Sequence, residues 1–373
     1  MSAWTASLAC SQARTATRMG QDKAATESKE QSMSKFLKNP QINGRTASLF
    51  WQGRTAPQVI SDLHGWEQNP QTMTQAGTGL WRFDFDLDED AYLEYALIDS
   101  ESRRRLRDPL NPRRVYNGMG AYNHNFYMPG AKPSSLIRVP KGGLRGKVSR
   151  HTVPAEYVST SKTRRVYLYQ PETREAVPLL AVYDGMDYFK RGKLTEIVDN
   201  LILQKRIRPV ALAFLENAGK ARMVEYACAE TTLAFLMSAV LPLAAQEIKL
   251  IDHEKQPGAH GILGASMGGL MSVYTALRLP QVFGRALSQA GAFELWEHET
   301  VAMELVRHAP RPEVKLWLDC GKNDFLCDAN RRMSGLLTEK GYDFSYHENG
   351  GAHNYNTWRD NLAPGLEALF GEA

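Results

Sequence analysis

A serine flanked by small residues marks the first place in this chain where chemistry is expected. The stretch reads Gly264-Ala265-Ser266-Met267-Gly268, with an apolar run before it and a helical pattern at 270–279 after it. A serine on such a strand-to-helix turn projects its hydroxyl into a cleft, and flanking glycines avoid collision with the neighbouring helix and strand. The pattern predicts that Ser266 is a nucleophile. The alternative is a tight turn that holds a structural serine.

A serine hydroxyl needs a base, and a group that orients this base, before it attacks a carbonyl near neutral pH. After a serine in this setting, the acid and then the histidine follow along the chain. Asp324 lies just past the apolar strand 314–319, where α/β sheets place their chemistry, and is the preferred acid. Asp319 is still inside that strand and Asp328 enters the next helix, so both are weaker candidates.

His353 is the predicted base. It follows the strand 342–347 after a Gly-Gly-Ala approach, which lets the loop fold tightly over the serine. The other histidines weighed for this role lie inside that strand or precede the acid: His347, His298 and His308. We expect His353 to take the proton of Ser266 while Asp324 holds the imidazole tautomer, which is the arrangement for acyl transfer.

The oxyanion of such a reaction needs two backbone donors. The amide of Met267, which begins the helix after the serine, is expected to be one. The other is expected after an earlier strand, where Gly185 or Met186 follows Tyr183-Asp184. No metal or other cofactor is predicted, since the sequence shows neither an HExxH motif nor a phosphate-binding glycine loop.

Two hydrophobic patterns divide the chain. From about 46 to 140, short alternating segments separated by turn residues predict an Ig-like antiparallel β-sandwich, with strands at 47–51, 58–60, 80–85 and 92–98. After about 150, buried-type strands at 178–183 and 210–215 alternate with helical stretches at 194–203, 226–240 and 269–279. This alternation predicts a three-layer α/β domain with a mostly parallel sheet. We predict a disordered extension at 1–40, the sandwich at 41–140, a linker at 129–152 and the catalytic domain at 150–373.

Composition agrees with a globular protein of two domains. The 373 residues are 43% hydrophobic and 23% charged, and the net charge of +4 gives no support for nucleic-acid binding. The longest apolar run, 233–243, is about half of the roughly 18–20 residues of a membrane helix, which argues against an integral membrane protein. Four sparse cysteines without a CxxC pair favour free thiols, including Cys320 and Cys327. With no signal peptide at 1–35, a cytoplasmic location is predicted.

These motifs resemble the enterochelin esterase group within the esterase D and feruloyl esterase relatives of the α/β-hydrolases. The resemblance runs along nearly the whole chain after residue 45 and rests on the stretches 179–188, 222–226, 264–269 and 351–354. The N-terminal part is similar to the early-set sandwich related to glycogen-binding modules, on the marks at 50–51, 79–82, 92–95 and 108–112. The resemblance implies ester hydrolysis by a serine triad, in a chain whose sandwich precedes the hydrolase.

The resemblance also implies which residues meet the substrate. It places Arg222 and Glu225 near the acyl pocket and adds Asp184 and Trp358 as substrate contacts. The residues alone allow another interpretation, because Arg222 and Glu225 stand three positions apart, where a structural ion pair is the default.

The substrate stays open at this point. The loop after His353, Asn354-Tyr355-Asn356-Thr357-Trp358, and the position of Asp324 are closer to the feruloyl esterase form. Residues 101–150, however, hold twelve Lys or Arg against two acids, and a basic lip would steer a polyanionic ferric catecholate siderophore. A solvated loop with surface ion pairs explains the same residues.

Three functions remain. The first is an esterase acting on a siderophore or a related small-molecule ester. The second is an esterase that releases hydroxycinnamate or acetate from plant-derived esters. The third is a non-catalytic carbohydrate-binding protein with a vestigial hydrolase domain, which the complete set of Ser266, Asp324 and His353 disfavours.

Overall fold

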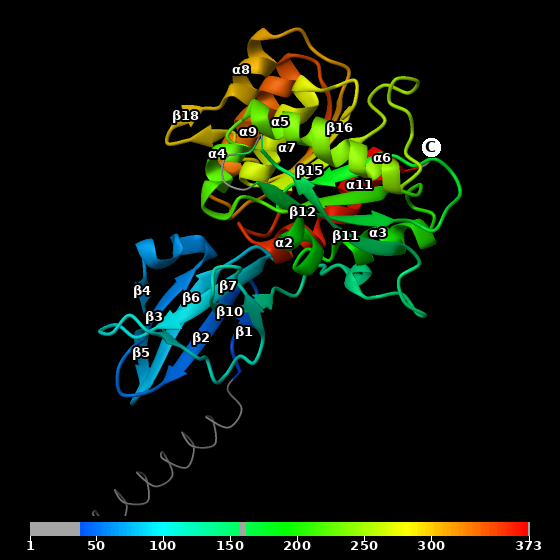
Figure 1. The fold of residues 1–373 in the computed structure, drawn as a ribbon. Coiled ribbons are helices and arrows are strands. Elements are labelled where there is room, and N and C mark those ends of the chain that lie inside the picture. Colours follow the sequence, from blue (N-terminus) through cyan, green and yellow to red (C-terminus); the bar gives the residue numbers. More distant parts are fainter. Residues whose placement is uncertain (1–37, 157, 159–161, 372–373) are drawn as a thin grey trace, which may run out of the picture.

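The computed structural model describes residues 38–371 except 157 and 159–161, and it confirms the predicted architecture of a β-sandwich followed by a three-layer α/β part (Figure 1). The predicted extension at 1–40 lies outside the described residues except for its last three positions.

Two antiparallel sheets form the sandwich. One has the order β1-β2-β6-β5 and the other β4-β3-β7-β10-β9, with β8 paired to β7. The strands are β1 (Gln41–Asn43), β2 (Thr46–Gln52), β3 (Gln58–Ser61), β4 (Gln71–Thr72), β5 (Thr74–Gly77), β6 (Leu80–Asp86), β7 (Tyr92–Ile98), β8 (Arg105–Leu106), β9 (Arg114–Tyr116) and β10 (Tyr122–Tyr127). Apolar side chains from both sheets, such as Leu49, Phe85 and Phe126, are buried between them, and Trp81 packs against this core.

An eight-stranded sheet forms the centre of the α/β part. Its order is β11-β12-β14-β13-β15-β16-β19-β20. The strands are β11 (Lys147–Pro154), β12 (Thr163–Gln170), β13 (Leu179–Val182), β14 (Ala211–Leu215), β15 (Gly261–Ala265), β16 (Arg285–Gln289), β19 (Lys315–Gly321) and β20 (Asp343–Asn349). The first two pairings are antiparallel and the rest are parallel. The predicted linker is thus shorter than expected, because β11 begins inside it.

Helices cover both faces of this sheet (Figure 1). One face carries α4 (Arg222–Tyr226), α5 (Glu230–Phe235), α6 (Leu241–Glu247), α7 (Met267–Arg278), α8 (Val301–His308) and α9 (Cys327–Glu339). The other carries α2 (Gly185–Lys190), α3 (Leu194–Leu203), α10 (Tyr355–Asp360) and α11 (Leu362–Phe370). Successive side chains of a strand point to opposite faces, so Ile262 packs into the first core and Leu263 into the second.

The prediction of one continuous helix at 226–240 was wrong. Cys228 has a φ of 57° and Ala229 is extended, so the chain leaves the helical conformation between α4 and α5. A π-helical turn, Leu236–Val240, then joins α5 to α6. Side-chain hydrophobicity alone does not show such a break, because both sides of it face the same core.

Free thiols are confirmed for Cys228, Cys320 and Cys327, while Cys10 lies outside the described residues. Within the described part of the chain, none of the individual helices has both the length and the apolar character needed to span a membrane. One pair of segments, Gly219–Tyr226 with Glu230–Glu247, meets those criteria together but is bent by 103°.

Candidate active site

Ser266 occupies a strained turn between β15 and α7. Its φ of 58° and ψ of −124° lie outside the regions that a non-glycine residue normally adopts. A Cβ atom at Gly264 would approach the backbone of Gly268 to less than 3.0 Å, so the strand and the helix meet at two glycines. The Ser266 amide donates to Gln289 O at 2.9 Å, and the Ala292 amide donates to Ser266 O at 3.0 Å. These bonds hold the turn to the end of β16 and leave the half-buried serine side chain at the carboxyl end of β15.

Asp324 and His353 are in direct contact. His353 Nδ1 lies 3.0 Å and 2.9 Å from the two carboxylate oxygens of Asp324, whose side chain has no exposed surface. The Leu326 amide also donates to Asp324 Oδ1, at 2.9 Å. Because Nδ1 faces the carboxylate, Nε2 is the ring nitrogen left for other chemistry. No hydrogen bond joins the Ser266 hydroxyl to His353 in the part of the chain described here.

The weaker acids have other partners. Asp319 is buried in β19, where it accepts from Gln289 Nε2 at 3.2 Å and from Trp317 Nε1 at 3.1 Å. Burial raises the pKa of Asp319 to about 7. Asp328 is exposed on α9 and pairs with Arg331. Of the three acids, Asp324 alone contacts His353.

The amides expected at the oxyanion lie at two helix starts. Met267 is the first residue of α7, and Gly185 and Met186 are the first two of α2. Amides in these positions have no carbonyl partner within their own helix. A Cβ atom at Gly268 would lie 3.3 Å from both Asp184 Oδ2 and Tyr183 Cβ, so the two helix starts are close neighbours. Their joint role toward an oxyanion stays a prediction.

Arg222 and Asp184 form a two-point ion pair. Arg222 Nε and Nη2 lie 2.7 Å and 2.5 Å from the two Asp184 oxygens, and Asn217 Nδ2 donates to Asp184 Oδ1 at 2.6 Å. Asp184 is buried, whereas a quarter of the Arg222 side chain is exposed. This pair holds Arg222 beside the loop that starts α2.

Glu225 pairs with Arg164 instead of Arg222. Arg164 Nη2 lies 2.5 Å from Glu225 Oε1, and both side chains are buried, with exposures of 4% and 6%. The ion pair between Arg222 and Glu225 that the residues alone suggested was therefore wrong. The reason is that Arg164 reaches Glu225 from β12, a partner 61 positions away that spacing on one helix does not reveal.

Two aromatic rings enclose His353. Trp358 of α10 is 5% exposed and meets the imidazole edge to face at a centroid distance of 5.0 Å. The ring of Phe325 lies at a centroid distance of 4.6 Å from the imidazole and is 78% exposed. Sequence reasoning missed Phe325, and its position next to Asp324 was the available signal. Whether Trp358 contacts a substrate stays a prediction.

The sandwich reaches the same region. Asp62, which begins the short 3₁₀ turn Asp62–His64, accepts a hydrogen bond from Asn354 Nδ2 at 3.1 Å. A cavity of about 300 Å³ between the two parts is lined by residues of both, including Tyr92 and Gly351, but not by Ser266 or His353. Nothing in the sequence indicated Asp62, because this contact joins positions 292 residues apart. Over the described residues, no group of three His, Cys, Asp or Glu side chains is arranged to hold a metal ion.

A family model described as "Putative esterase" matches residues 158–369, which is more than half of the chain. The chain belongs to this esterase family. This esterase is therefore an ester hydrolase, and the interpretation as a non-catalytic carbohydrate-binding protein is set aside.

Full-length relatives share both parts of this esterase. It is 23% identical to the iron(III) enterobactin esterase of Dickeya dadantii (strain 3937) over 369 residues, covering 84% of this chain and 83% of the relative. The solved ferric enterobactin esterase from Salmonella typhimurium superposes with a TM-score of 0.78 at 19% identity, over 91% of this chain and 98% of the other. A solved ferulic acid esterase reaches 0.52 at 15% identity over 61% of this chain and 99% of its own. At these identities, the solved structures show the fold. Together with the family model and the curated relative, they confirm the predicted resemblance to enterochelin esterases.

Proposed function

We propose that this esterase works through a triad of Ser266, His353 and Asp324. Nε2 of His353 accepts the hydroxyl proton as Ser266 Oγ attacks the carbonyl carbon of the ester. His353 returns the proton to the departing alcohol, and an acyl-enzyme remains on Ser266. Water then repeats the sequence and releases the acid. The support is the strained turn at Ser266 together with the two contacts between His353 and Asp324.

We propose amides of Met267 and of Gly185 or Met186 as the donors to the oxyanion. The close contact between the starts of α2 and α7 supports this assignment. Arg222 is the proposed substrate contact at the edge of the site, because Asp184 fixes its guanidinium while part of it remains exposed. Glu225 is buried against Arg164, which favours a structural role for Glu225 over contact with the substrate.

A ferric catecholate siderophore ester is the proposed substrate, and a cytoplasmic location is proposed with it. The observation that carries the substrate is the likeness to iron(III) enterobactin esterases along both the sandwich and the α/β part. The ferulic acid esterase structure corresponds to 61% of this chain and leaves the remainder unmatched. A ferulate-type ester is therefore the second candidate, supported by the loop after His353.

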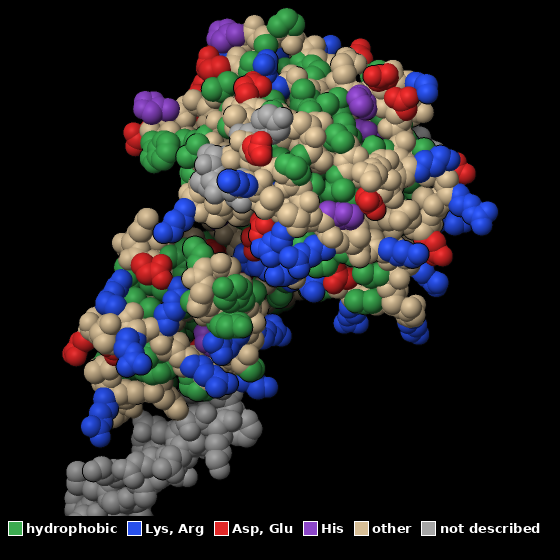
Figure 2. Space-filling model, in the orientation of Figure 1, with side chains coloured by type: hydrophobic (Ala, Val, Ile, Leu, Met, Phe, Trp, Pro, Cys, Tyr) green, Lys and Arg blue, Asp and Glu red, His purple; other side chains and the backbone are tan. Residues whose placement is uncertain are grey.

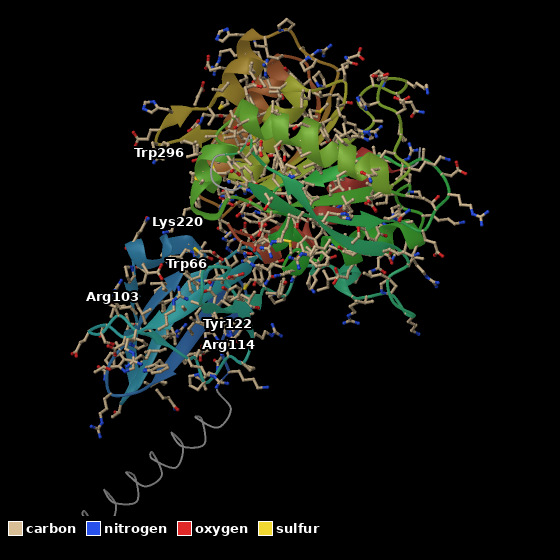
Figure 3. The ribbon with its side chains drawn as sticks, in the orientation of Figure 1. Trp66, Arg103, Arg114, Tyr122, Lys220 and Trp296 are labelled. Atoms are coloured by element: carbon tan, nitrogen blue, oxygen red, sulfur yellow. The ribbon has the colours of Figure 1, made fainter. Side chains whose placement is uncertain are left out.

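The basic residues of 101–150 agree with a polyanionic substrate. Of the twelve, only Arg105 has an ion pair within the described residues, to Glu67 at 2.9 Å. The other eleven have no ion pair within the described residues, which favours a basic surface over neutralising surface pairs. Figure 2 shows Lys and Arg side chains spread over the sandwich and near its junction with the α/β part, and Figure 3 places Arg103 and Arg114 among them. Unpaired cations attract an anionic ligand over a range of about 10 Å at moderate salt.

Hydrolysis of ferric enterobactin, methyl ferulate and p-nitrophenyl acetate tests both proposals. Wild type should cleave the siderophore with the highest kcat/KM, and Ser266→Ala should lose turnover of all three. Ser238→Ala, at an exposed serine far along the chain from this turn, is the matched control and should behave as wild type. Turnover that survives in Ser266→Ala would refute the triad. A preference for methyl ferulate would refute the siderophore substrate and leave the esterase mechanism in place.

A further inference from the structure

The sandwich is hydrogen-bonded to the segment that carries His353. Figure 1 shows this C-terminal segment, in red, on the side of the α/β part that faces the sandwich. Hydrogen bonds between the two include those from Asn354 Nδ2 to Asp62 Oδ2 (3.1 Å), from Asn356 Nδ2 to Tyr92 Oη (2.5 Å) and from Tyr127 Oη to Asp360 Oδ2 (2.7 Å). Arg359 Nη2 also donates to Tyr127 Oη, at 3.0 Å. The residues of the segment that make these bonds all lie within seven positions after His353. The backbone that positions the imidazole is thus held by contacts from both parts of the chain.

Asp62 is the member of this set that lies beside the catalytic residues. Its Oδ2 accepts from the Glu94 backbone amide of β7 at 2.9 Å as well as from Asn354. The bond from the Glu94 amide holds the Asp62 carboxyl on its own sheet. The carboxyl is therefore fixed in place where it accepts from Asn354. Burial and the nearby carboxylates of Glu94 and Asp324 raise the pKa of Asp62, whereas its two hydrogen bonds act in the opposite direction.

Asn354 links the fixed Asp62 carboxyl to the backbone that carries His353. Its Oδ1 accepts from the Thr357 amide at 2.9 Å and thereby caps α10, while its Nδ2 donates to Asp62. Both ends of one carboxamide are therefore engaged. The residue before the cap is His353, and the helix that it starts carries Trp358, which packs on the imidazole. A rotation of this carboxamide would move the backbone on which the imidazole stands.

We propose that Asp62 of the sandwich is a positioning residue for His353, acting through the carboxamide of Asn354. This inference rests on the proposed role of His353 as the general base. An imidazole displaced by about 1 Å loses roughly 10²-fold in rate, because proton transfer needs close alignment with the serine. Asp62 reaches the histidine segment through Asn354, so its loss should lower kcat and leave KM unchanged.

The test compares variants on p-nitrophenyl acetate, a small ester chosen to limit contact between the substrate and the sandwich. Asp62→Ala removes the acceptor, whereas Asp62→Asn keeps an oxygen in its place. Asn354→Ser keeps a residue that caps helices well but is too short to reach Asp62. Asp86→Ala is the matched control, because Asp86 is an exposed sandwich acid paired with Arg45.

We expect kcat to fall roughly 10- to 100-fold in Asp62→Ala and in Asn354→Ser, with KM within about twofold of wild type. The double variant should be no worse than the single ones, since both break the same bond. Asp62→Asn should retain most of the wild-type kcat, and Asp86→Ala all of it.

Three results would overturn the inference: kcat of Asp62→Ala within about twofold of wild type, equal losses in Asp62→Asn and Asp62→Ala, or a loss confined to KM. If Asp62→Ala shows no cooperative thermal transition, Asn354→Ser decides, because it alters the same bond from the other side. Ser266→Ala separates this outcome from a failure of the proposed function. An inactive Ser266→Ala beside a fully active Asp62→Ala rejects the positioning role alone.

Discussion

The contact between Gly264 and Gly268 allows a quantitative prediction about the nucleophile turn. In Gly264→Ala, the new Cβ would stand 2.8 Å from the Gly268 Cα, whereas ordinary contact begins at 3.4 Å. The start of α7 must therefore retreat by about 0.6 Å at this atom, and by more at the Gly268 carbonyl, which lies closer. Met267, the proposed oxyanion donor, lies on the part of the helix that moves. We expect overpacking to cost roughly 1–3 kcal/mol of unfolding free energy.

The same displacement predicts a loss of activity. A shift approaching 1 Å between the nucleophile and its oxyanion donor corresponds to about 10²-fold in kcat. Steady-state hydrolysis of p-nitrophenyl acetate and the thermal midpoint measure the two effects on one protein sample. The loss should appear in kcat more than in KM, because the oxyanion develops only as the bond forms.

Gly335→Ala is the matched control for this prediction. Gly335 lies on the exposed side of α9, and a Cβ atom there would meet nothing within 4 Å. The same chemical change should stabilise this helix by about 0.5–1 kcal/mol and leave kcat unchanged. Wild-type kcat and an undiminished thermal midpoint in Gly264→Ala would refute the steric account of the turn.

Three further substitutions probe the acid, the buried ion pair and the pH response. Asp324→Asn should lower kcat by roughly 10³- to 10⁴-fold with little change in KM in steady-state kinetics, because an amide cannot support the imidazolium of His353; a tenfold loss or less would argue against the triad. Arg164→Met should cost about 3–5 kcal/mol in urea unfolding, since it removes the cation beside the buried Glu225 carboxylate, and an unchanged midpoint would contradict this. The pKa of Asp319 is about 7 when folded against an ordinary 3.8, so the folded state binds the proton more tightly. The preference of the folded state for protonated Asp319 therefore adds stability fully below pH 4. This stability, roughly 4 kcal/mol, is lost as the pH rises to 7. Asp319→Asn should flatten that part of the curve of stability against pH, and parallel curves for the two proteins would refute the shift.

Some of the candidate site could be read from local patterns. The glycines around Ser266, with a strand before them and a helix after them, indicate a tight strand-to-helix turn at the serine. Asp324 and His353 follow the ends of β19 and β20, and parallel strands bring their carboxyl ends to one edge of a sheet. The contact between the two residues was therefore predictable from their places along the chain. Their catalytic roles stay predictions.

Other features depend on partners that no local pattern contains. Glu225 is paired from β12, and Asp184 is paired by Arg222. The break after α4 was also hidden, because hydrophobic periodicity continues across it.

The sequence by itself determined the two-part architecture, the strand-to-helix turn of the serine and the order of the acid and the histidine. Each of these follows from short-range rules of periodicity, sterics and chain direction. Only the tertiary structure decided that the sandwich bonds to the histidine segment through Asp62 and Asn354. The physical reason is that a hydrogen bond between parts of the chain far apart in sequence depends on how two folded surfaces meet. Residue type and spacing carry no information about that meeting.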